Sequence, residues 1–167
     1  MGAAVLSCLV FGVTVASAAK THKAKAKGTK VGCKLSTSIA IPAGDTQLAL
    51  PADSGNLYGS VSCAKALGAG LFGATFALQD SGDLTGKFKQ FFGTGSLKGS
   101  FDLTPGDSQP PSPGSFESQD YTGTATVAGG TGAYKGVTGT ATLTCNSPDS
   151  VHMSCKETFH LLKLAKG

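Results

Sequence analysis

The sequence contains neither tryptophan nor arginine, and only 14% of its 167 residues are charged. Long helix-forming runs are also scarce, because serine, threonine and 24 glycines are spread along the chain. This composition argues against an all-α fold. The lack of arginine argues against nucleic acid as a partner, since proteins that bind phosphates favour the planar, bidentate guanidinium group.

The basic character of the chain comes from one short segment near its start. From residue 31 onward, nine lysines stand against ten acidic residues, a net charge of −1. We interpret residues 19–30 as a flexible, solvated Lys-rich tail. The alternative is that this tail contacts an anionic surface of the cell envelope by Coulomb attraction. Its lysines are Lys20, Lys23, Lys25, Lys27 and Lys30.

The first residues have the character of a removable export signal. An apolar run, short for a membrane span, ends in Ala16-Ser17-Ala18, a small-x-small pattern that suits signal peptidase. The positive charge that usually precedes such a run is missing. A retained anchor or a lipid on Cys8 are the alternatives. We expect residues 1–18 to be a signal peptide and the mature protein to be secreted or extracytoplasmic.

Four cysteines follow the export signal, and an even number in an exported chain predicts two disulfides. Cys145 and Cys155 flank a turn-rich stretch, so they are natural partners across one hairpin. Cys33 and Cys63 would then join the first two strands. We favour this pairing over the two other connectivities. A zinc site would need ligands at close CxxC-like spacing, which does not occur, so we predict no metal.

From residue 31 onward, apolar and polar residues alternate with a period of two, which is typical of strands that bury one face. Near the C-terminal end, for example, alternate threonines oppose Ala141, Leu143 and Cys145. β-Branched threonine suits the exposed face of a pleated sheet. We predict strands at about residues 31–41, 57–64, 70–79, 84–92, 95–103, 119–128, 136–146 and 151–164.

These strands predict an all-β domain over residues 31–167, a single antiparallel β-barrel of about eight strands. A two-sheet sandwich is the alternative. Glycine recurs inside the strands, as at Gly59, Gly99 and Gly139, and repeated interior glycine suits a sheet that coils and closes. Residues 104–115 contain four prolines and predict an exposed linker, with a flap over the barrel mouth as the alternative.

Residues 128–141 read AGGTGAYKGVTGTA, and this segment resembles the glycine-rich turn of the allene oxide cyclase and dirigent β-barrels. Gly129, Gly130 and Gly132 permit a turn with positive φ, and Tyr134 can pack over the barrel end. Residues 93–101, GTGSLKGSF, resemble the preceding strand of small exported bacterial members of this superfamily. The turn motif comprises Gly129, Gly130, Thr131, Gly132, Tyr134 and Gly136.

The resemblance implies a barrel that holds an apolar compound. Plant allene oxide cyclases close a fatty-acid epoxide into a cyclopentenone, and dirigent proteins steer the coupling of phenoxy radicals. Their catalytic residues lie outside the matched turn, so none is carried over to this chain. The export signal and the disulfides differ from the plastid cyclases, which argues against the same reaction.

Motifs that would identify an enzyme directly are missing. The sequence has no serine-hydrolase elbow, zinc-protease helix or phosphate-binding loop. His152 and His160 are candidate bases near neutral pH. By alternation they share a face with Ser154 and Lys156, so we expect both histidines on the wet outside.

Glu157 is the candidate catalytic residue. Alternation places it on the apolar face, where burial would raise the pKa of its carboxyl and suit it to acid or base chemistry. We favour instead a bulge near Cys155 that turns Glu157 outward, or a position at the open barrel end. Phe91 and Phe92 cannot both point inward on a regular strand. We favour core packing across a bulge over a place for one of them at the rim, open to a ligand or partner.

We expect a non-enzymatic exported barrel that binds a small apolar ligand or serves as a component of the cell surface or envelope. The alternative is an isomerase-, cyclase- or dirigent-like enzyme that acts on an apolar substrate inside the barrel. An enzyme requires an enclosed cavity with converging polar groups, whereas a structural barrel is filled by leucine, phenylalanine and valine with Glu157 outside. No cofactor is expected, and the sequence does not indicate an oligomeric state.

Overall fold

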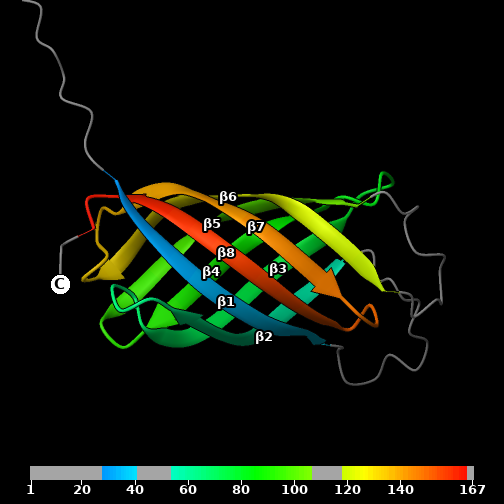
Figure 1. Cartoon of the computed structure of the whole chain (residues 1–167), viewed down its shortest axis with the longest axis horizontal. Helices are drawn as coiled ribbons and strands as arrows, with labels where there is room; N and C mark the ends of the chain where they lie inside the picture. The colour runs from blue at the N-terminus through cyan, green and yellow to red at the C-terminus, as the bar shows by residue number, and fades with distance from the viewer. Residues whose placement is uncertain (1–27, 41–53, 107–117, 165–167) are drawn as a thin grey trace, which may run out of the picture.

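The computed structural model describes residues 28–40, 54–106 and 118–164, which form one closed antiparallel β-barrel (Figure 1). None of these residues belongs to a helix of the length and hydrophobicity that a bilayer crossing needs. Within the described residues the strands are β1 Thr29–Ala40, β2 Ser54–Cys63, β3 Ala69–Leu78, β4 Leu84–Phe92, β5 Gly95–Pro105, β6 Gln119–Gly132, β7 Thr138–Ser147 and β8 His152–Leu162.

The alternation of the sequence accounts for this barrel. In β1, Val31, Cys33 and Leu35 point inward and are buried, whereas Lys34 and Ser36 face the solvent. The other strands repeat the pattern, and their inward side chains form one continuous hydrophobic core. Each strand pairs with the next one in the sequence, and β8 pairs with β1 to close the sheet. The fold is therefore the predicted eight-stranded barrel and not the two-sheet sandwich.

Several strand boundaries differ from the prediction, and two of these differences change how a segment is interpreted. β1 begins at Thr29, because Thr29 and Lys30 already pair with β8, so Lys30 belongs to this strand and not to a tail. β5 runs to Pro105, which lies opposite Tyr121. Proline lacks a backbone donor but still fits at a strand end. A linker that starts at residue 104 is therefore wrong. Residues 107–115, the predicted signal peptide and the tail before residue 28 lie outside the described residues.

Both disulfides have the predicted partners. Cys33 of β1 is bonded to Cys63 of β2, and Cys145 of β7 is bonded to Cys155 of β8. The two bonds lie on either side of the seam where β1 meets β8. Disulfides of this kind are typical of extracytoplasmic proteins.

The glycine-rich turn connects β6 to β7. Gly132 and Gly136 have φ values of 58° and 76°, in the left-handed region that favours glycine. Gly130 does not have the predicted positive φ. Glycine fits there because the strands approach closely, and a Cβ would overlap the carbonyl oxygen of Ser96. Tyr134 is buried, its ring lies edge-on to Phe92 at 5.7 Å, and its hydroxyl accepts a hydrogen bond of 2.9 Å from Thr94. The turn thus packs against the barrel rather than projecting from it.

Candidate functional site

Inside the barrel, a carboxyl group and a carboxamide meet from strands on opposite sides. Gln90 of β4 and Glu157 of β8 both point inward, and Gln90 Nε2 donates a hydrogen bond of 2.8 Å to Glu157 Oε2. Gln90 is fully buried, and Glu157 is 3% exposed. Gln90 Oε1 is also buried and has no hydrogen-bond partner among the described residues. The pair is therefore a polar contact enclosed by the core.

The expectation that a bulge turns Glu157 outward is wrong. β8 pairs with β1 and β7 without a register shift, and Glu157 lies opposite Cys33 and Leu143. Regular alternation therefore keeps the carboxyl inside. Burial raises the pKa of Glu157 to about 7 from its ordinary 4.5, and the hydrogen bond from Gln90 offsets only part of this rise. Near neutral pH the carboxyl exchanges between its charged and neutral forms.

A cavity of about 20 Å³ lies beside Glu157. Its other walls are apolar except for Thr37, whose hydroxyl donates a 3.3 Å hydrogen bond to the carbonyl of Met153. A space of this size holds about one water-sized group. The inner cavity thus offers one carboxyl for proton transfer but no room for a substrate of several heavy atoms.

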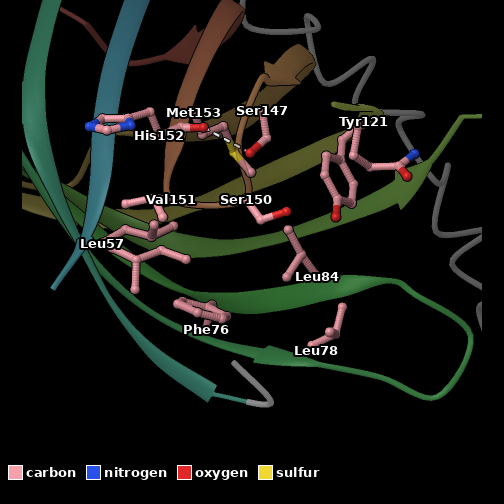
Figure 2. A pocket seen from close by; sticks show the side chains of 12 residues that line it. Leu57, Phe76, Leu78, Leu84, Tyr121, Ser147, Ser150, Val151, His152 and Met153 are labelled. Carbon is pink, nitrogen blue, oxygen red and sulfur yellow. Dashed lines mark hydrogen bonds between the residues drawn. The ribbon is translucent and has the colours of Figure 1, made fainter. Parts of the chain in front are cut away.

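A second hollow, of about 40 Å³, opens at the end of the barrel where β3 ends and β4 and β8 begin (Figure 2). In this view Phe76 and Leu78 lie across the hollow from Met153 and Ser147. The space holds about two water-sized groups. We call this hollow the mouth; its apolar lining consists of Ile39, Leu57, Phe76, Leu78, Leu84, Val151 and Met153.

The mouth also carries a few polar groups. Burial raises the pKa of Tyr121, so its phenol stays protonated at neutral pH and can donate a hydrogen bond. Ser147 Oγ donates a 2.8 Å hydrogen bond to the carbonyl of His152. Gln119 completes this side of the hollow, and its Nε2 donates to the carbonyl of Asp120 at 3.1 Å. Ser150 and His152 also line the mouth. Most of the walls are nevertheless apolar.

Leu57 and Met153 line both the mouth and the inner cavity, so they form the partition between them. Methionine is unbranched, has three rotatable bonds and adapts to irregular spaces. A change in the Met153 rotamer is therefore the simplest way to connect the mouth with the space beside Glu157.

The two histidines are on the outer face of the barrel, as predicted, and His152 also lines the mouth. His152 and His160 are both exposed. His152 Nδ1 lies 2.7 Å from Asp149 Oδ2, and Asp149 Oδ1 accepts hydrogen bonds from the backbone N–H groups of His152 and Val151. These bonds hold the pKa of Asp149 at about 2, well below its ordinary value. His152 and Asp149 thus stabilise the β7–β8 turn. Among the described residues, no three potential metal ligands come together.

The aromatic pair on β4 also differs from the favoured interpretation. Phe92 is buried in the core, but Phe91 points outward and is 45% exposed. β4 pairs with β3 and β5 without a register shift, so no bulge brings Phe91 inside. Phe91 is therefore open to a partner on the outer face.

Two residues of the site, Gln90 and Tyr121, were not singled out from the sequence. Gln90 alternates in phase with Phe88 and Phe92, so its inward position could have been predicted from the sequence. Its partner was not, because Gln90 and Glu157 are 67 positions apart. Tyr121 likewise alternates with Ala125 on the buried face of β6. Comparison of the chain with protein-family models and with curated proteins finds no match. The site is therefore interpreted from its own geometry.

Proposed function

We propose that the protein is a non-enzymatic, extracytoplasmic binding protein that takes a small apolar ligand, or the apolar end of a larger one, at the barrel mouth. The observation that carries this proposal is the mouth itself, a hollow of about 40 Å³ with mostly aliphatic and aromatic walls. Binding sites for small molecules are typically concave and apolar, with a few placed polar groups. Tyr121 supplies such a group.

The energetics of the mouth support a ligand. Leu78, Leu84 and Val151 are only partly buried, so a ligand would remove their apolar surface from water. Each square ångström so covered contributes about 25 cal/mol. The hollow admits a group of a few heavy atoms, and displacement of Met153 extends it toward Glu157. The proposal therefore favours a narrow ligand that enters end-on.

Other features support the proposed location and relationship. The predicted signal peptide, residues 1–18, and the two disulfides suit an exported protein. The closed barrel and the turn at residues 129–136 support the proposed relationship to the allene oxide cyclase and dirigent superfamily, whose barrels hold apolar compounds.

A plugged mouth tests the proposal. The protein, produced with its disulfides intact, is analysed by native mass spectrometry and solvent extraction, and then titrated with trans-parinaric acid, a fluorescent polyene whose narrow chain can enter end-on. Leu84→Trp should fill the mouth and weaken probe binding at least about tenfold, because the indole occupies the ligand's space. Leu162→Trp, at the exposed opposite end of the barrel, is the matched control and should bind as the wild type does. Equal binding by the wild type and Leu84→Trp would place the site elsewhere.

The buried carboxyl favours one alternative, an isomerase- or cyclase-like enzyme in which Glu157 transfers a proton to or from an apolar substrate. The small inner cavity argues against it, because the substrate would have to displace core side chains. Extracts of the wild type and Glu157→Gln separate the two functions. An enzyme would yield product from the wild type and substrate from the variant, whereas a binding protein would yield one compound from both.

A further inference from the structure

Large hydrophobic side chains gather on the outer face of β2, β3 and β4. Of the four that are exposed in the described part of the chain, three lie here: Tyr58 at 57%, Leu71 at 66% and Phe91 at 45%. Leu71 and Phe91 are direct cross-strand partners. Isolated exposed hydrophobic residues are ordinary on protein surfaces, but their concentration in one place marks an interaction site.

Three exposed lysines adjoin these side chains. Lys89 and Lys98 face each other directly across β4 and β5, and Lys87 lies two residues before Lys89 on the same face. Lys89 Nζ also lies 4.7 Å from the centre of the Phe91 ring. Like charges directly opposite on neighbouring strands destabilise a sheet. The direct opposition of Lys89 and Lys98 therefore costs stability, and the contact between Lys89 and Phe91 offsets part of that cost.

In the part of the chain that the structure describes, these lysines have no carboxylate partner. The ion pair found among the described residues joins His152 to Asp149, so none of the three lysines is paired with a carboxylate there. Asp102 lies on the same outer face, two residues beyond Ser100, the β5 residue that pairs with Lys87. The positive charge of the patch therefore remains available to an external anion.

The patch is hollowed rather than convex. An open hollow of about 700 Å³ is lined by Tyr58, Phe91 and the three lysines, and Gly73 contributes no side chain between Tyr58 and Lys89. A register shift between Lys98 and Gly99 places a β-bulge at its β5–β6 border. Bulges often occur next to binding sites, where they redirect side chains.

A second, more polar hollow of about 410 Å³ continues from the first, since Lys87 and Ser100 line both. Its walls are rich in hydroxyl groups and include one carboxylate. We call the two hollows together the outer groove. The polar lining of the second hollow includes Thr85, Ser100, Asp102, Thr124 and Thr126.

We propose that the outer groove binds an acidic polysaccharide. The C–H faces of sugar rings pack on exposed aromatic rings such as Tyr58 and Phe91, and the carboxylates or sulfates of the chain pair with the lysines. Sugar hydroxyl groups bond to the threonine, serine and aspartate side chains of the second hollow. The hydroxyl-lined second hollow suits a polar chain better than a lipid surface, because the apolar part of a bilayer would leave its threonine and serine hydroxyl groups without hydrogen-bond partners. This site is on the outer wall and is independent of the mouth.

The test uses hyaluronan and dextran sulfate as acidic polysaccharides, measured by calorimetry with the full-length, disulfide-intact protein. Neutral dextran, poly-glutamate and vesicles of phosphatidylglycerol are the comparison ligands. We expect an acidic polysaccharide to bind, more weakly at high salt, and the comparison ligands to bind at least about tenfold more weakly. Equal binding of poly-glutamate or vesicles would overturn the proposal, because charge alone would then suffice. Failure of both acidic polysaccharides to bind would overturn it too.

Matched variants locate the site. Lys89→Gln/Lys98→Gln should weaken binding at least about tenfold and flatten its salt dependence. The control is Lys34→Gln/Lys156→Gln, which removes another directly opposed lysine pair, on β1 and β8. The cross-strand partners on either side of this pair are Ser62 and Thr144, and the variant should bind normally. Phe91→Ala should weaken binding about five- to tenfold. Equal losses in the two lysine variants would contradict a site in the groove. Leu84→Trp should bind the polysaccharide normally, which separates this test from that of the mouth.

Discussion

At the scale of single residues, the Glu157 carboxyl couples stability to pH. Its pKa is about 7 in the folded protein and near 4.5 in the unfolded chain. Below pH 4.5 both states hold the proton, and the contribution of Glu157 to stability is greatest. Between pH 4.5 and about 7 only the unfolded chain releases it, so the free energy of unfolding falls by about 3 kcal/mol, and above this range it levels off. Urea unfolding of the wild type from pH 4 to 8 should show this decline.

Replacement of the carboxyl by an amide removes that decline. Glu157→Gln stays neutral at every pH, keeps the acceptor for Gln90 Nε2 and adds a donor that can reach the unpaired Gln90 Oε1. We expect the variant to be more stable than the wild type at pH 8 and nearly as stable at pH 4. Asp102→Asn, on the exposed face, is the control and should retain the wild-type profile. A pH-dependent Glu157→Gln profile would mean that another buried group is responsible.

At the scale of secondary-structure elements, most of the fold was predictable because its signals are local. The alternation of apolar and polar residues indicated each strand, and the cysteines occupy apolar positions of that alternation. The turn between Cys145 and Cys155 made their pairing readable. The direction of Glu157 was misjudged because a lone carboxylate on an apolar face is costly. What stabilises it is Gln90, from a strand on the opposite side of the closed barrel, and nothing local indicates that contact.

The β6–β7 turn depends on glycine at a specific position. Gly132 combines a φ of 58° with a site where a Cβ would overlap the Thr94 carbonyl oxygen. Gly132→Ala should therefore destabilise the protein by at least about 2 kcal/mol in urea unfolding. Gly32→Ala is the matched control, since Gly32 is an exposed strand residue whose added Cβ meets nothing within 4 Å. Its effect should stay within about 0.5 kcal/mol. Similar losses for the two variants would show that the turn tolerates a side chain.

At the scale of the whole molecule, barrel closure is the costly step. β1 and β8 lie at opposite ends of the described chain, so their pairing closes the longest loop. The two disulfides flank this seam without crossing it, since each joins strands that are already sequence neighbours. Among the described residues, the seam is thus held by backbone hydrogen bonds, the side-chain hydrogen bond from Thr37 to Met153 and core packing, without a covalent bond across it. The disulfides act instead by restricting the unfolded chain on both sides of it.

This arrangement predicts graded effects of the two disulfides. Cys33–Cys63 spans 30 residues and Cys145–Cys155 spans 10, so replacing both cysteines of a pair by alanine should cost about 4 and about 3 kcal/mol, respectively. The two losses together approach the whole stability of a typical domain, about 5–15 kcal/mol. We therefore expect each double variant to fold with a lowered urea midpoint and the quadruple variant to be largely unfolded at 37 °C by circular dichroism. A quadruple variant as stable as either double variant would mean that the strand pairing across the β1–β8 seam supports the barrel without covalent help.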